Sequence, residues 1–130
     1  MDLLQEIYKD DPWKMLVCCI LLNLTHRRQV DKIRDELFNR YPTPVHMAFS
    51  NEEELSTMLT PLGFYNKRAI TLKRMSLEYL RGFKDVGDLY GVGKYAEDSW
   101  EIFQNENYKI DPEDKVLKKY LNSRSTSAVF

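Results

Sequence analysis

The sequence has very little cysteine and no excess of charge of either sign. Its 130 residues contain two cysteines, Cys18 and Cys19, which are adjacent. Neighbouring cysteines can neither build a disulfide framework nor supply spaced ligands to a metal, so we expect reduced thiols and an intracellular protein. Lys and Arg number 19 against 20 Asp and Glu, a formal net charge of −1. This balance argues against a polycationic tail, although nucleic-acid binding depends on how charge is distributed.

Long hydrophobic runs and targeting signals are also missing. The first six residues are mixed and acidic, unlike a signal peptide. The longest apolar run covers residues 15–22, well short of the roughly 18 residues that span a bilayer, so we expect a buried helix there and no membrane segment. With 43% hydrophobic and 30% charged residues, the chain can bury a core and has the size of one domain.

Glycine and proline are few, and their positions favour helices. Asp11-Pro12 predicts a helix start, because Asp can cap and Pro fits the first turn. Ser50 and Glu53 form a capping-box pattern for a helix to about 59. Other helices are expected at about 27–40, at 66–81, at 86–90, through Tyr95 to Phe103, and from Asp111-Pro112. The apolar face of the helix at 66–81 would consist of Ile70, Leu72, Met75, Tyr79 and Leu80. Strand-like alternation is nearly absent, so the fold class is all-α, with about seven to nine short helices.

The most informative segment is residues 89–96, Leu-Tyr-Gly-Val-Gly-Lys-Tyr-Ala. Gly91 and Gly93 allow a sharp turn between two helices and let backbone N–H groups approach an anion. Gly93 would start the next helix, where free amides and the helix dipole favour phosphate. Residues 61–94 carry seven basic and three acidic side chains, or +4 locally. We expect DNA-backbone contacts here, although Gly-x-Gly alone also fits a tight turn and a charged helix also fits a solvated face.

Five short motifs, in this order, resemble one family. They are Asp-Pro-Trp-Lys-Met-Leu at 11–16, Leu-Asn-Leu-Thr at 22–25, Pro-Leu-Gly-Phe-Tyr at 61–65, Gly-Val-Gly-Lys-Tyr at 91–95 and Pro-Glu-Asp-Lys at 112–115. Together they are similar to the helix-hairpin-helix DNA glycosylase superfamily that includes endonuclease III and MutY. Within it they are most similar to the glycosylase domains of the methyl-CpG-binding-domain protein four family. The resemblance covers about residues 3–121.

The resemblance implies a catalytic role for Asp114, whose carboxylate would stabilise positive charge at the sugar or position a water. We expect Asp114 in the first turn of its helix, where the dipole favours the ionised form. Tyr95 stands where bifunctional relatives carry the lysine that forms a Schiff base, which implies a monofunctional enzyme that uses water. Tyr95 and Gln5 would shape the base pocket. Each residue also has an alternative role. Asp114 could be only a carboxylate at a helix start, Tyr95 a packed aromatic ring and Gln5 an exposed side chain.

The resemblance also assigns residues that contact DNA. Phe64 would be the wedge that fills the space left by the flipped base. Gly91, Gly93 and Lys94 would hold the DNA backbone. Leu24 departs from an arginine that probes the duplex in the vertebrate-type family, and Arg27 or Arg28 could substitute for it.

No cofactor is expected. No cysteine follows Cys19, which excludes the four-cysteine iron–sulfur loop of many relatives. His26 and His46 are far apart and have no other potential metal ligands near them in sequence, so we expect both to be surface residues and expect no metal site. Hairpins of this kind often recruit a monovalent cation through backbone carbonyls, and that option stays open here.

We therefore expect one helix-hairpin-helix glycosylase domain at residues 1–122 and a tail at 123–130 that is frayed or truncated. It would act as a monomer on double-stranded DNA with a mismatched or flipped pyrimidine, removing thymine or uracil opposite guanine. It would lie in the nucleus if the source is eukaryotic, and otherwise with the DNA inside the cell. The alternatives are a glycosylase of other base specificity, a non-catalytic helix-hairpin-helix DNA-binding module and, more remotely, a protein-interaction domain.

Overall fold

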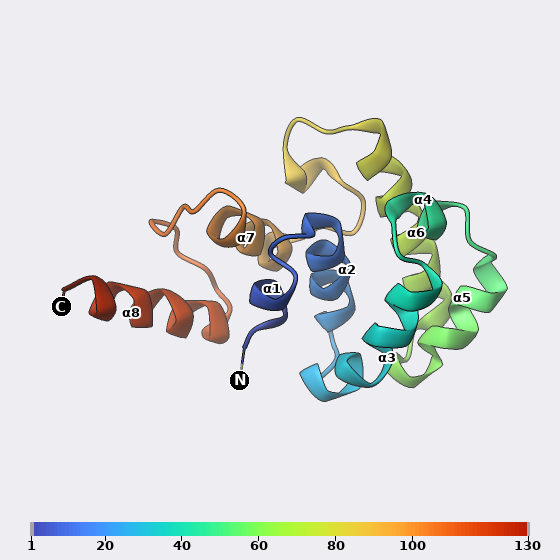
Figure 1. The fold of residues 1–130 in the computed structure, drawn as a ribbon, viewed down its shortest axis with the longest axis horizontal. Coiled ribbons are helices and arrows are strands. Elements are labelled where there is room, and N and C mark those ends of the chain that lie inside the picture. Colours follow the sequence, from blue (N-terminus) through green and yellow to red (C-terminus); the bar gives the residue numbers. More distant parts are fainter. Residues whose placement is uncertain (1, 130) are drawn as a thin grey trace.

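The computed structural model describes the backbone of residues 2–129 and the side chains of residues 2–124, and within this range it contains helices and no strand. Figure 1 shows their arrangement. The elements are α1 (Leu4–Ile7), α2 (Pro12–Leu22), α3 (Arg27–Arg40), α4 (Pro44–Ala48), α5 (Glu52–Leu59), η1 (Thr60–Leu62), α6 (Tyr65–Arg81), η2 (Val86–Asp88), α7 (Lys94–Phe103) and α8 (Lys115–Val129). The expected all-α class and number of helices are confirmed. None of the described helices is long and apolar enough to cross a membrane.

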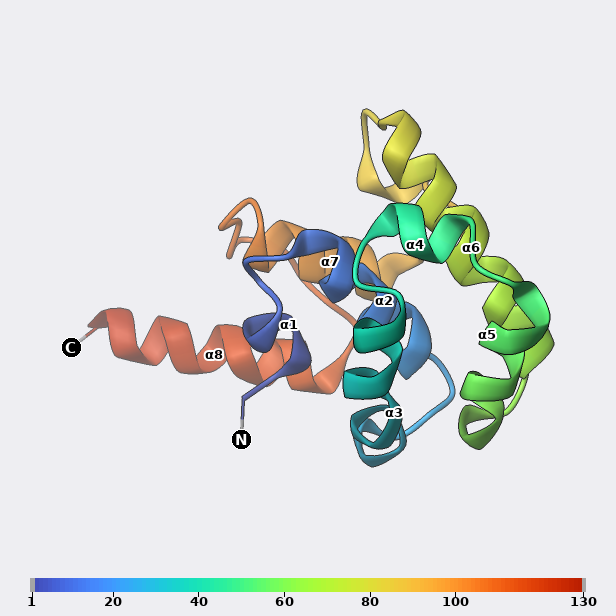
Figure 2. The same ribbon diagram turned by 45° about the vertical axis from the view of Figure 1, so that its right-hand side comes forward.

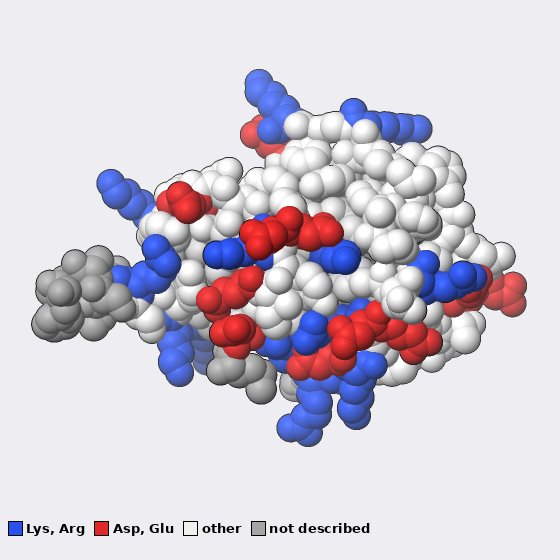
Figure 3. All heavy atoms as spheres, viewed as in Figure 1, with Lys and Arg blue, Asp and Glu red and all other residues white. Residues whose placement is uncertain are grey.

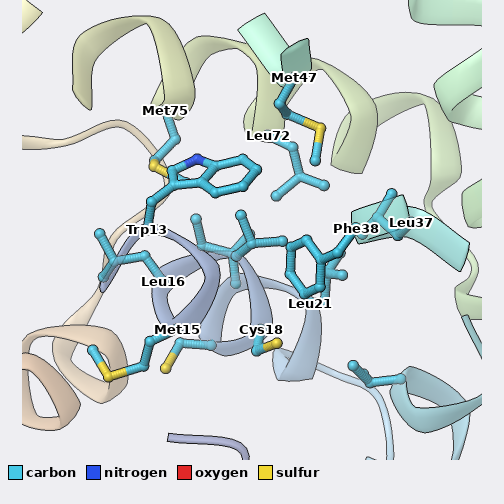
Figure 4. Close-up of a cluster of buried hydrophobic side chains, with 14 of the residues drawn as sticks. Trp13, Met15, Leu16, Cys18, Leu21, Leu37, Phe38, Met47, Leu72 and Met75 are labelled. Atoms are coloured by element: carbon cyan, nitrogen blue, oxygen red, sulfur yellow. The ribbon is translucent and has the colours of Figure 1, made fainter. Parts of the chain in front are cut away.

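Helix α2 is the centre of the core. It begins as predicted, with the Asp11 side chain accepting a hydrogen bond from the Lys14 amide and Pro12 in the first turn. Residues 15–21 are all buried, and α2 packs against α1, α3, α6 and α7. Figure 4 shows the Trp13 ring of α2 among Met75 and Leu72 of α6 and Phe38 of α3. The Trp13 Nε1–H donates to Ser76 Oγ at 2.9 Å, which satisfies the only polar atom of the indole.

Helices α3 to α6 form the part of the fold next to one side of α2 (Figure 1). Two sequence expectations are corrected here, and one helix appears that the sequence did not predict. The predicted capping box at Ser50 is wrong, because Asn51 is the N-cap of α5 and accepts from the Glu54 amide, while the Ser50 hydroxyl donates to the Met47 carbonyl. Helix α4 was not predicted. Ile70 and Leu80 are exposed rather than core residues of α6.

Helices α7 and α8 lie on the other side of α2, and both ribbon views place α8 opposite α5 (Figures 1 and 2). A small cluster of Ile102, Leu117 and Leu121 joins α8 to α7. The Phe103 and Tyr120 rings, 4.9 Å apart, pack at its edge. Helix α8 begins at Lys115, so the helix start predicted at Asp111-Pro112 is wrong. The boundary expected at residue 122 falls inside α8.

Charge is mixed over the face of the molecule that Figure 3 shows. In Figure 3, acidic and basic side chains intermingle on the face in view, which agrees with the formal net charge of −1.

Candidate active site

One cavity of about 970 Å³ gathers most of the residues that the sequence singled out. Its walls come from the N-terminal segment with α1, the end of α2 and the loop after it, the start of α6, the hairpin before α7, and the starts of α7 and α8. The predicted site residues in its lining are Gln5, Arg27, Phe64, Gly91, Gly93, Lys94, Tyr95 and Asp114. Arg28 is exposed and is not part of the lining. The volume lies within the range of pockets that enclose a small ligand.

Gln5 and Tyr95 form a hydrogen-bonded pair in the cavity wall. Gln5 is 2% exposed, and its Nε2 donates to the Tyr95 hydroxyl at 2.7 Å and to Ser99 Oγ at 3.1 Å. The Ser99 hydroxyl in turn donates to the Tyr95 carbonyl at 2.9 Å. Both amide protons of Gln5 are therefore used, which leaves Gln5 Oε1 as its acceptor and the Tyr95 hydroxyl proton as a donor.

Two titratable groups of the cavity lining, the Tyr95 phenol and the Cys19 thiol, are neutral at neutral pH. Burial raises the pKa of the Tyr95 phenol well above its usual value, with smaller contributions from nearby Cys19 and Asp114. Burial also raises the pKa of the Cys19 thiol, to about 12. Neither group is a ready nucleophile at neutral pH, because the thiolate is the reactive form of cysteine.

Asp114 lies at the N-terminal end of α8 and faces the cavity. Its Oδ2 accepts a hydrogen bond from the Leu117 amide at 2.9 Å, and its carbonyl accepts from the Lys118 amide. Asp114 is therefore the N-cap of α8, and the expectation that it lies in the first turn is corrected by one position. No described residue donates to Asp114 Oδ1, so this oxygen remains available to a ligand.

The Gly-x-Gly turn lies between η2 and α7 and lines the cavity. Gly91 has φ +81°, and a Cβ placed on it would lie 2.4 Å from Thr71 Cγ2 of α6. Gly93 has an ordinary φ and open space around its Cα, and it is the N-cap of α7. Gly91 thus serves the turn itself, while Gly93 exposes the first amides of α7 to the cavity, where an anion is favoured.

Two of the predicted phosphate-binding cations have partners within the protein. Lys94 Nζ lies 2.7 Å from Asp98 Oδ2 and donates to the Asp111 carbonyl. Arg27 pairs with Asp31 and donates to the Asp2 carbonyl. Lys67 of α6, one of the seven basic residues counted at 61–94, also lines the cavity.

Two apolar side chains stand at the rim of the cavity, and we call Leu24 and Phe64 the rim pair. Leu24 is 79% exposed and Phe64 is 65% exposed. Both have left-handed backbone, with φ +61° and +46°. Left-handed backbone costs a residue with a side chain about 1–2 kcal/mol, so neighbouring contacts must hold it in place.

Sequence reasoning counted Arg68 only among the seven basic residues expected to face DNA at 61–94 and missed that it binds the segments of the rim pair. Arg68 is 7% exposed, and burial lowers the pKa of its guanidinium. Its Nε donates to the Gly63 carbonyl at 2.8 Å, and its Nη2 donates to the Asn23 carbonyl at 2.9 Å. One signal could have found it, since Arg68 falls four residues before the core residue Leu72 on the same face of α6.

The structure also describes both histidines. His26 and His46 are exposed, and the described residues contain no group of three acidic, histidine or cysteine side chains able to hold a metal ion.

Comparison with known proteins gives consistent matches. Residues 17–123 match the family model described as "HhH-GPD superfamily base excision DNA repair protein". The chain is 40% identical over 121 residues, 92% of its length, to a methyl-CpG-binding domain protein 4-like protein of Arabidopsis thaliana. It is 38% identical over 94 residues, 66% of its length, to a thymine/uracil-DNA glycosylase of Pyrobaculum aerophilum. The chain spans only 27% and 41% of the lengths of these two relatives.

A solved structure is similar as well. The structure of a thermostable thymine-DNA glycosylase superposes with a TM-score of 0.70 at 25% identity, over 75% of this chain and 49% of that one.

Proposed function

Because this chain belongs to the HhH-GPD superfamily of base excision DNA repair proteins, we propose that it is a monofunctional DNA N-glycosylase that removes thymine or uracil opposite guanine. The observation that carries the proposal is the single cavity that joins the Asp114 carboxylate to the hydrogen-bonded pair of Gln5 and Tyr95. The relatives named for thymine and uracil support the choice of base. Residues 1–122 would form the acting domain, as a monomer on the DNA and in the nucleus of a eukaryotic source.

The pair of Gln5 and Tyr95 is suited to the imide edge of thymine or uracil. Gln5 Oε1 can accept from the N3–H of the base, because both Gln5 amide protons already bind Tyr95 and Ser99. The Tyr95 hydroxyl, which accepts from Gln5, can donate its proton to a carbonyl oxygen of the base. The base must first leave the duplex, and a mismatched base leaves at the lowest cost, which favours G·T and G·U over a paired cytosine.

Asp114 is suited to the bond-breaking step. As the bond between N1 of the base and C1′ of the sugar breaks, positive charge develops on the sugar, and a nearby carboxylate stabilises it. Water then adds its hydroxyl to C1′, and its proton leaves with the base. Because Leu117 binds one oxygen of Asp114, the other is held toward the cavity without a competing partner among the described residues.

The absence of lyase activity is proposed from the chemistry of two residues. A Schiff base needs a neutral amine at the sugar, and Tyr95 offers a phenol instead. The neighbouring Lys94 amine is held by Asp98 at 2.7 Å, and this hydrogen bond raises the pKa of Lys94, which keeps it protonated. The product would be an abasic site in an intact strand.

The test is a panel of duplexes, each with one defined base pair. The protein is incubated with G·T, G·U, A·T, A·U and G·C duplexes and with single oxidised or methylated pyrimidines, and strands are analysed with and without alkali. Cleavage of G·T or G·U strands only after alkali is the expected result. Cleavage without alkali, or trapping by borohydride, would show lyase activity instead.

Two other outcomes would replace the proposal. Excision of a different base would assign another specificity to the same pocket. Duplex binding without excision of any base would assign a non-catalytic DNA-binding module.

A further inference from the structure

The buried cation Arg68 has carbonyl groups as partners instead of a carboxylate. Its guanidinium binds the carbonyls of Gly63, Asn23 and Leu21, the last at 3.5 Å, and no described acidic side chain lies within ion-pair distance of it. A buried charge without a counter-ion is costly. Leu21 and Asn23 are at the C-terminal end of α2, where the helix dipole is negative and partly compensates the charge.

Two of these carbonyls directly precede the rim pair. Asn23 precedes Leu24, and Gly63 precedes Phe64. The described residues contain three non-glycine residues with positive φ, and the rim pair accounts for two of them. One side chain therefore fixes the peptide that leads into each of two left-handed, exposed apolar residues. The guanidinium also lies 5.9 Å from the centre of the Phe64 ring.

The rim pair comes from segments about 40 residues apart in sequence, and both residues line the same cavity. Exposed apolar side chains held in a strained backbone at one rim are typical of an interaction site rather than of ordinary surface. Gln29 joins the two segments at a distance from the rim pair, since it accepts from the His26 amide and donates to the Pro61 carbonyl at 3.5 Å. Arg68 joins them at the rim pair itself, because it binds the carbonyl directly before each of the two residues.

We propose that Arg68 is a positioning residue that holds Leu24 and Phe64 together as a two-part apolar wedge for the base stack of duplex DNA. The proposal rests on the base-flipping function proposed above. Arg68 also lines the cavity, but its guanidinium is bound to loop carbonyls, so its proposed role is to position the rim pair. It orders two loops before binding, so that less conformational freedom is lost when their side chains enter the duplex.

Hydrogen exchange tests the contact without reference to activity. In Arg68→Lys, the charge remains but the planar fork that reaches several carbonyls is lost. We expect faster exchange in both peptides that cover residues 22–27 and 60–66, and unchanged exchange in α3. Arg40→Met, at the exposed end of α3, is the control. Unchanged exchange in either rim segment would overturn the proposal.

A double-mutant cycle tests the role in excision. Single-turnover rates on a G·U duplex are measured for Arg68→Lys and Arg68→Met, each alone and combined with Leu24→Ala and Phe64→Ala. Misplacement of the wedge should slow excision by up to about a hundredfold. In the protein that lacks both rim side chains, the same Arg68 change should alter the rate by no more than about twofold.

The outcomes are separable. Equal effects of the Arg68 change in both backgrounds would mean a general structural role and would overturn the proposal. If Arg68→Met does not fold, the Lys variant supplies the cycle. If the unmodified protein excises no base, the proposed function fails, while the exchange experiment still decides whether Arg68 holds the two segments.

Discussion

The side-chain amide of Gln5 donates to the hydroxyl of Tyr95 at 2.7 Å, which joins residues 90 positions apart in the chain. The contact brings the N-terminal segment against the first turn of α7, and Ser99 completes it from the next turn. A buried amide held in this way presents one fixed acceptor to the cavity, and the phenol presents one fixed donor.

Replacement of the phenol tests this pair. Tyr95→Phe removes the donor and leaves one Gln5 proton unpaired, so we expect excision to slow about tenfold, as for the loss of one hydrogen bond. Single-turnover rates on a G·U duplex measure the effect. Ser99→Ala is the matched control, because it removes the other Gln5 acceptor but no group that faces the base. An equal loss in both variants would assign the pair a structural role only.

The carboxylate can be changed without loss of the helix cap. Asp114→Asn keeps a side-chain oxygen for the Leu117 amide, and Asn caps helices as well as Asp does. We expect thermal stability close to that of the unmodified protein and excision slower by roughly a hundredfold or more, the usual cost of losing one charge-stabilising group. Asp111→Asn is the control. Full activity of Asp114→Asn would exclude the proposed catalytic role.

The two glycines of the hairpin should respond differently to alanine. At Gly91, the left-handed φ costs about 1–2 kcal/mol, and the Cβ would also meet Thr71, so Gly91→Ala should lower the unfolding free energy measured in urea. Thr71→Ser removes the clashing methyl group and should restore part of the loss. Gly93→Ala should leave stability almost unchanged and weaken duplex binding, since its Cβ would stand before the free amides of α7. Equal destabilisation by both alanines would contradict this assignment.

Buried thiols should make the fold sensitive to alkali. Burial raises the pKa of Cys18, and that of Cys19 to about 12, against an ordinary value of 9.0. Above pH 9 the unfolded chain releases protons that the folded chain keeps, so the free energy of unfolding should fall as pH rises. The slope is about 1.4 kcal/mol per pH unit for each thiol. Urea unfolding between pH 8 and pH 11 measures it.

The control for the alkaline slope is the double variant Cys18→Ala/Cys19→Ala. It should lose the decline that begins near pH 9 and keep the later decline above pH 10, because the raised pKa values of Tyr8, Tyr41, Tyr79 and Tyr95 act in the same direction. An unchanged slope in the double variant would refute the assignment to the thiols.

Local signals predicted the start of one helix, α2, correctly. Asp11-Pro12 fixed the start of α2, because a cap and a first-turn proline act together within four residues. The same dipeptide at 111–112 predicted a helix start that is wrong. The N-cap is Asp114, two residues later, and Pro112 is buried before the helix begins. At the start of α5, two residues able to cap the helix, Ser50 and Asn51, are adjacent, and the N-cap is Asn51.

The site was predicted through resemblance more than through local pattern. Eight predicted residues line one cavity, yet no spacing rule brings Gln5 to Tyr95 or Asp114 to Cys19. The spacing of Arg68 from Leu72 could have placed it on the buried face of α6, but its partners could not be predicted, because they are backbone carbonyls in two distant loops and any residue type supplies such a carbonyl.

The position of Asp114 at the start of α8 has a consequence for how the protein is made. Synthesis proceeds from the N-terminus, and folding can begin before the chain is finished. The walls of the cavity from α1, α2, α6 and α7 leave the ribosome before Asp114 does, and α8 is attached mainly through Ile102, Leu117 and Leu121. A partly made chain therefore has the surfaces proposed to bind DNA before it has the carboxylate proposed to break a bond, so the proposed catalytic group is synthesised after the proposed DNA-binding surfaces.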